Sequence, residues 1–144
     1  MMPSDANPSG NVFGGAIMKL VDQVGGIVAA KHSQSRIVTA SVDRLDFLAP
    51  VYIGDVVTLI ASLTYIGKTS MEVGVRIESD NPITGEHRHT GSCYLTYVAF
   101  DEAGKPKLIP QVTLETEEEK KLWQQGAIRK QRRLSQMGRF NLPG

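Results

Sequence analysis

The longest stretch of helical periodicity covers residues 16–32. Its apolar side chains recur every three or four positions, the spacing of one helix face; they are Ile17, Leu20, Val21, Val24, Ile27 and Val28. At about 100° per residue, a second stripe of mostly small residues lies beside the first, formed by Met18, Asp22, Gly25 and Ala29. We therefore expect a helix that is buried on both faces, with one carboxylate near an interface.

Alternating apolar and polar positions predict four β-strands after this helix. The alternating segments are 37–48, 56–65, 71–77 and 88–100, and turn-forming residues separate them. One long helix followed by several antiparallel strands predicts an α+β fold, in which the sheet carries its helix on one face.

The end of the chain has a different pattern. Thr116 and Glu119 have the spacing of a capping box, and acidic residues precede basic ones along the following segment, which matches a helix dipole. We expect residues 113–144 to form a C-terminal helix and tail packed on the domain of residues 1–112, with residues 135–144 as a frayed end.

Composition excludes several classes of protein. The chain has 144 residues, a formal net charge of +1 and one cysteine, which fits one domain in a reducing compartment and carries no nucleic-acid signature. No run of about 18 apolar residues is present, and the N-terminus lacks a signal-peptide pattern. We therefore expect a cytoplasmic protein that binds neither membrane nor nucleic acid.

Three glycines, Gly10, Gly14 and Gly15, precede the first helix. Their spacing is not that of a dinucleotide-binding loop, and no hydrophobic strand comes before them. Two interpretations stay open: a tight turn that caps a buried helix, or a loop whose free N–H groups hold a polarised carbonyl or an anion.

Other motifs carry weaker signals. The sequence Gly67-Lys68-Thr69 resembles the end of a P-loop, but it joins two strands, so it is a hairpin turn that either is plain or also touches a phosphate. His87 and His89 have no third ligand nearby in sequence, so no metal site is expected. Cys93 lies in an alternating apolar strand and is expected in the core.

As a set, five segments of the chain resemble the hotdog-fold acyl-CoA thioesterases. The closest resemblance is to the branch of the brain-type acyl-CoA hydrolases and their single-domain bacterial relatives. The segments are 3–15, 18–22, 37–43, 67–73 and 110–121, so the resemblance covers nearly the whole chain. It implies hydrolysis of fatty acyl-CoA to free acid and CoA, in a hotdog fold whose antiparallel sheet wraps the long central helix.

The resemblance also implies site residues and partners. The family's catalytic asparagine falls on Asn11 and its aspartate on Asp22, with the Gly15 N–H donating a hydrogen bond to the thioester carbonyl oxygen. In a single-domain chain one residue would come from each subunit of a homodimer, and such dimers would assemble as a homohexamer. CoA contacts would fall on the turn and the last helix, at Gly67, Lys68, Thr69, Ser70, Arg129, Arg132 and Arg133. CoA is part of the substrate, and no metal or other cofactor is implied.

Two other functions remain open for such a fold. One is a non-catalytic acyl-CoA-binding protein, which the pairing of Asn11 with Asp22 disfavours. The other is a hotdog hydratase or dehydratase, which needs a histidine in the site, and the chain has only His32, His87 and His89. Relatives also have an additional strand before residues 2–5, so we expect either a very short first strand or a chain trimmed upstream.

Overall fold

The computed structural model describes residues 1–6, 8, 11–12 and 14–140. Gly10 of the predicted glycine loop lies outside these residues. The elements in chain order are the 3-10 helix η1 (Pro3–Asp5), α1 (Gly14–Ser33), β1 (Arg36–Phe47), β2 (Val56–Ile66), β3 (Ser70–Asp80), β4 (His87–Phe100) and α2 (Glu117–Phe140).

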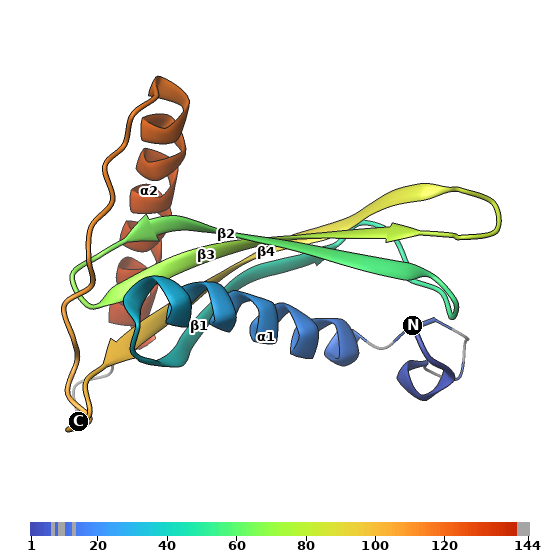
Figure 1. Cartoon of the computed structure of the whole chain (residues 1–144), viewed down its shortest axis with the longest axis horizontal. Helices are drawn as coiled ribbons and strands as arrows, with labels where there is room; N and C mark the ends of the chain where they lie inside the picture. The colour runs from blue at the N-terminus through green and yellow to red at the C-terminus, as the bar shows by residue number, and fades with distance from the viewer. Residues whose placement is uncertain (7, 9–10, 13, 141–144) are drawn as a thin grey trace.

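The four strands form one antiparallel sheet in the order β1-β4-β3-β2. Helix α1 runs along one face of this sheet, and α2 stands across its far end (Figure 1). Because strand side chains alternate between faces, Val73 of β3 lies in the core shared with α1, whereas its neighbour Glu72 contacts α2. The predicted α+β arrangement is confirmed, and the two helices lie on opposite faces.

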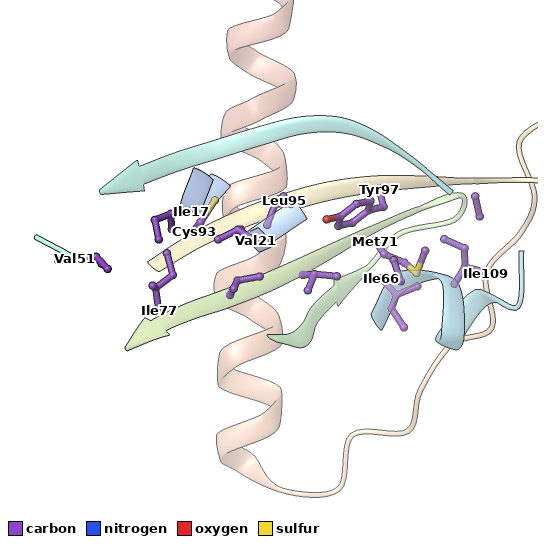
Figure 2. Packing of buried hydrophobic residues seen from close by; sticks show 14 residues of the cluster. Ile17, Val21, Val51, Ile66, Met71, Ile77, Cys93, Leu95, Tyr97 and Ile109 are labelled. Atoms are coloured by element: carbon purple, nitrogen blue, oxygen red, sulfur yellow. The ribbon is translucent and has the colours of Figure 1, made fainter. Parts of the chain in front are cut away.

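The buried row of α1 differs from the predicted one. It runs along every fourth position, Ile17, Val21, Gly25 and Ala29, whereas Ile27 of the predicted core stripe is 66% exposed. The row combines Ile17 and Val21 of the first stripe with Gly25 and Ala29 of the second, whose small side chains let the helix approach the sheet closely. The core is completed by inward-facing side chains of β3 and β4 (Figure 2).

The sequence of β1 predicts that its side chains alternate between the two faces of the sheet along the whole strand. The structure shows that this alternation is interrupted. The pairing with β4 shifts between Thr39 and Ser41, and again between Asp43 and Asp46. Each irregularity changes which face the following residues point to. As a result Thr39 lies opposite Tyr97, which is buried in the core on the α1 side, while Asp43 contacts α2.

Helix α2 begins close to the predicted position. Thr116 Oγ1 accepts a hydrogen bond of 3.0 Å from the Glu119 N–H, and the Glu119 carboxylate accepts one of 3.0 Å from the Glu115 N–H. The helix then continues to Phe140, so the expectation of a frayed end is wrong for residues 135–140, and residues 141–144 lie outside the described part. No helix among the described residues is long and apolar enough to cross a bilayer.

Candidate active site

Asp22 lies in α1, half-buried against the sheet. Its Oδ1 accepts a hydrogen bond of 2.8 Å from Thr39 Oγ1 and one of 3.0 Å from the Tyr97 hydroxyl. Thr39 in β1 and Tyr97 in β4 are directly opposed cross-strand partners, so their side chains reach the helix from adjacent positions on one face of the sheet. Among the described residues, no hydrogen bond is made by the other carboxylate oxygen, Oδ2.

The two donors to Asp22 were not singled out from sequence. Thr39 is one of several polar residues in its strand, so its hydroxyl does not stand out. Tyr97 lies in an inward-facing row with Leu95 and Ala99, a pattern that predicts only a hydrophobic core. The available signal was a polar group at an inward position of an otherwise apolar strand. Such a group needs a partner, but the sequence does not say which one.

Asn11 and Gly15 lie at the other end of the site region, around the start of α1. Asn11 lines a pocket of about 350 Å³ together with Val12, Gly14, Ile17 and residues 47–51. A Cβ added to Gly14 would lie 3.3 Å from the Phe47 ring, whereas a Cβ added to Gly15 would meet nothing within 4 Å. The packing of this chain therefore explains a small residue at Gly14, but it leaves open space at Gly15.

Asn11 and Asp22 lie well apart within the described part of one chain. Asp22 is eight residues beyond Gly14 on α1, which is about 12 Å along the helix axis. The pocket at Asn11 is closed by the end of β1 around Phe47, whereas Asp22 contacts Thr39, near the start of the same strand. The two predicted catalytic residues therefore occupy separate positions along the face that carries α1.

The predicted CoA-binding turn lies against α2. Gln111 Nε2 donates to the Gly67 carbonyl at 3.0 Å, and the Ile109 N–H donates to the Lys68 carbonyl at 2.8 Å, which fixes the turn. A Cβ on Gly67 would come within 2.3 Å of Lys130 Nζ. Lys130 of α2 therefore lies beside the turn, and it is not among the residues predicted from the sequence.

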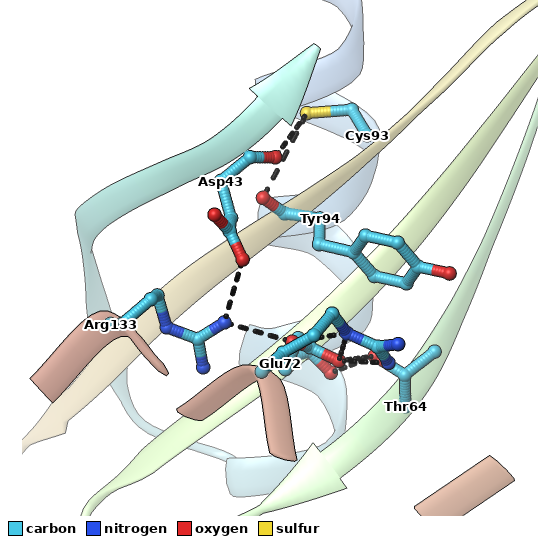
Figure 3. Close-up of polar contacts among 7 residues, drawn as sticks. Asp43, Thr64, Glu72, Cys93, Tyr94 and Arg133 are labelled. Atoms are coloured by element: carbon cyan, nitrogen blue, oxygen red, sulfur yellow. Dashed lines mark hydrogen bonds and ion pairs between the residues drawn. The ribbon is translucent and has the colours of Figure 1, made fainter. Parts of the chain in front are cut away.

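The predicted arginines of α2 have different surroundings, and Figure 3 shows Arg133 between Asp43 and Glu72. Arg129 donates through Nε and Nη2 to the Glu72 carboxylate, with a shortest distance of 2.7 Å. Arg133 Nη1 donates to Glu72 at 2.9 Å and to Asp43 at 3.3 Å. Arg132 is exposed. The first two guanidinium groups therefore tie α2 to the sheet.

Glu72 is the centre of this network and is only 1% exposed. Burial alone would raise its pKa, but hydrogen bonds from Arg129, Thr64 and Arg133 outweigh that effect and hold the pKa below its usual value. Arg129 also lies 3.8 Å from the centroid of the Tyr94 ring, a cation–π contact on the same face.

Cys93 and His87 were also considered as site residues from the sequence, and the structure shows the surroundings of both. Cys93 is buried in the core, as predicted, and burial followed by the charge of Asp43 raises its pKa to about 11. His87 lies beside Asp80 and Glu78, with distances of 2.6 Å and 2.8 Å. Within the described ranges, no group of histidine, cysteine and acidic residues is arranged to hold a metal ion.

Comparison with known proteins identifies the family. The model of the thioesterase superfamily matches residues 9–86. The mouse cytosolic acyl coenzyme A thioester hydrolase is 40% identical over 126 residues, which cover 86% of this chain and 33% of that protein. The chain therefore spans about a third of the length of this mammalian relative.

Solved structures give the same result. A hexameric acyl-CoA thioesterase in its apo form superposes with a TM-score of 0.89 at 43% identity, covering 95% of this chain and 88% of that one. An acyl-CoA hydrolase from Staphylococcus aureus, solved with butyryl-CoA and CoA, has a TM-score of 0.86 at 38% identity, covering 95% and 84%.

Three further structures of the S. aureus protein carry alanine in place of an aspartate, an asparagine and a threonine. The asparagine precedes the aspartate by 15 residues in that sequence, and the threonine follows it by 17. Together with the helix-on-sheet architecture, these matches show that the chain belongs to the thioesterase superfamily, with the hotdog fold that its sequence resembles.

Proposed function

We propose that this protein hydrolyses the thioester bond of acyl-CoA, releasing a free acid and CoA. The observation that carries the proposal is the setting of Asp22, a half-buried carboxylate held through Oδ1 by two hydroxyl donors. The names of the relatives, which are acyl-CoA thioester hydrolases and acyl-CoA hydrolases, support the same reaction.

Asp22 would act through Oδ2. As a general base, it takes a proton from a water that attacks the thioester carbonyl, and the tetrahedral intermediate then expels the CoA thiolate. Direct attack by the same oxygen is the alternative. It would expel the CoA thiolate and form an acyl-enzyme anhydride, which water then hydrolyses to the free acid and the Asp22 carboxylate. The Gly15 N–H, in the first turn of α1, would stabilise the developing oxyanion with the help of the helix dipole.

The spacing in the S. aureus protein supports Asp22 and adds Thr39. Thr39 follows Asp22 by 17 residues, the separation found between the substituted threonine and aspartate there. In the S. aureus protein the substituted asparagine precedes the aspartate by 15 residues. The residue 15 positions before Asp22 in this chain is Asn7. Asn7 lies outside the described residues, and the spacing favours it over the predicted Asn11 as the asparagine that orients water or carbonyl.

We also propose that each active site is shared between two subunits. Relatives of this chain include hexameric thioesterases. The separation along α1 between the glycine segment and Asp22 supports a site that is completed by a second copy. In a two-fold dimer one chain would supply the asparagine and Gly15, and the partner would supply Asp22.

The phosphates of CoA would bind at the turn between β2 and β3. Lys68 is exposed in this turn. Two cations of α2 are also available, because Lys130 lies beside Gly67 and Arg132 is exposed. Arg129 and Arg133 remain predicted CoA contacts, although their ion pairs with Glu72 favour a structural role.

Neither alternative function has similar support. A hydratase or dehydratase would need a histidine at the site, but His32 Nε2 is paired with the Pro110 carbonyl, and His87 lies at the β3–β4 hairpin beside Asp80. A non-catalytic binder would not need a carboxylate held by two donors.

Release of free thiol from a panel of acyl-CoA esters of increasing chain length tests the proposal. We expect turnover with the wild-type protein and a clear chain-length preference. Tight binding of acyl-CoA without thiol release would support the binding protein. Interconversion of 3-hydroxyacyl-CoA and enoyl-CoA, assayed alongside the panel, would support the hydratase class. The name of the mouse relative supports a cytoplasmic location.

A further inference from the structure

Tyr97 is the largest fully buried side chain of the core. It belongs to the inward-facing row of β4, where its neighbours Leu95 and Ala99 are apolar. Phenylalanine would fill the same volume without a hydroxyl, and burying a hydroxyl costs free energy unless it finds a partner. The hydroxyl of Tyr97 therefore needs an explanation beyond packing.

The hydroxyl finds its partner in Asp22. It lies 3.0 Å from Asp22 Oδ1 and 3.1 Å from the Asp22 backbone carbonyl oxygen. Its single proton is attracted more strongly by the charged carboxylate than by the carbonyl. Burial, and then the hydrogen bond and charge of Asp22, raise the pKa of Tyr97, so it stays a proton donor across the working pH range.

Gly25 provides the space for this contact. A Cβ built on Gly25 would lie 2.5 Å from the Tyr97 hydroxyl oxygen, but 3.3 Å from the ring carbon Cζ that carries it. A glycine inside a helix destabilises the helix relative to alanine. A side chain at position 25 would therefore collide with the hydroxyl of Tyr97 much more severely than with its ring.

We propose that Tyr97 is a positioning residue for the Asp22 carboxylate, and that Gly25 admits its hydroxyl to the helix. This inference rests on the proposed thioesterase function and deepens it. With Thr39 and Tyr97 both donating to Oδ1 from opposed strand positions, the carboxylate is held against rotation about its own bond. Oδ2 is then presented to the substrate side in one orientation.

The first test is Tyr97→Phe, which removes one oxygen and keeps the ring. We expect kcat to fall about tenfold, the scale of one lost hydrogen bond to a charged group, with KM unchanged because no substrate contact is lost. Tyr94→Phe is the matched control, since Tyr94 lies on the same strand but faces α2. That control should keep the wild-type kcat.

Two combinations separate positioning from a merely structural role. In an Asp22→Asn background, Tyr97→Phe should cause no further loss, because the carboxylate through which it acts is absent. Gly25→Ala should lower kcat as Tyr97→Phe does, and the double variant should be no worse than either single one. Additive losses, or a full kcat in Tyr97→Phe while Asp22→Asn is inactive, would overturn the inference and leave the function intact. An inactive wild-type protein would overturn both.

Discussion

Thr39 of β1 donates a hydrogen bond of 2.8 Å to Asp22 of α1, linking the strand at the edge of the sheet to the central helix. The bond fixes one carboxylate oxygen of the residue that we propose as the base. Substitutions of Asp22 and of Thr39 should therefore affect activity to different extents.

We expect Asp22→Asn to lower kcat by about two orders of magnitude or more, the range of lost acid–base catalysis. The amide keeps the shape of the carboxylate, so the thermal unfolding temperature should change little. Thr39→Ala should lower kcat less, because it removes one of two donors and leaves the base in place. Turnover of Asp22→Asn above about a third of wild type would show that Asp22 is not the base.

The choice between two asparagines can be decided directly. We expect Asn7→Ala to lower kcat by about tenfold or more, on the scale of one positioning contact, and Asn11→Ala to have the smaller effect. Steady-state kinetics on both variants, with unfolding temperatures measured in parallel, makes the comparison. The reverse order of losses would return the catalytic asparagine to Asn11.

The shared site can be tested with mixed dimers. If the asparagine and Asp22 come from different chains, a dimer of an asparagine variant and an Asp22→Ala variant has both defects in one site and none in the other. Random assembly of equal amounts gives about half mixed dimers, so about a quarter of wild-type activity should return. Co-expression with two affinity tags verifies the mixing.

Recovery close to zero in verified mixed dimers would place both residues in one chain. The proposed thioesterase activity would stand in that case. The asparagine variant used is whichever of Asn7→Ala and Asn11→Ala lowers kcat more. Two copies of one variant with different tags serve as the control and give the residual activity to subtract.

The cations of α2 should separate into two groups. Replacing Lys130 and Arg132 by alanine should raise KM more than it lowers kcat, because remote contacts to CoA contribute uniform binding. The rise should shrink at high ionic strength, since exposed charges are screened. Arg129→Ala should instead lower the free energy of unfolding by on the order of 3 kcal/mol, because it leaves the buried Glu72 with fewer partners. A raised KM at unchanged stability in Arg129→Ala would assign that arginine to CoA.

The network around Glu72 should also make stability depend on pH. The hydrogen bonds from the arginines and Thr64 outweigh burial and hold the folded-state pKa of Glu72 below its ordinary value of 4.5. Its contribution is therefore present above pH of about 4.5 and lost as pH falls through the lower folded-state pKa. We expect Glu72→Gln to unfold at a lower temperature than wild type at pH 7, with the difference shrinking towards pH 3. A difference that stays constant over this range would contradict the assignment.

The order and type of the elements followed from the sequence because they depend on local periodicity. Local patterns in the sequence mark α1, the four strands and the capping residue Thr116 that precedes α2. Asp22 stood out for a similar reason, because a carboxylate among small residues on one helix stripe is unusual. Local patterns also misplaced features, since the irregular pairing of β1 and the exposure of Ile27 depend on what packs against them.

Only the tertiary structure decided which side chains meet. Tyr97 reaches Asp22 across 75 residues of chain, and Arg129 reaches Glu72 across 57. Such pairs leave no periodic signal, because their partners are set by how the sheet stacks between the two helices. The sequence by itself determined that Gly25 is small and that Arg129 is charged. Packing determined that the glycine makes room for a hydroxyl and that the arginine neutralises a buried carboxylate, since both depend on distances that exist only in the folded chain.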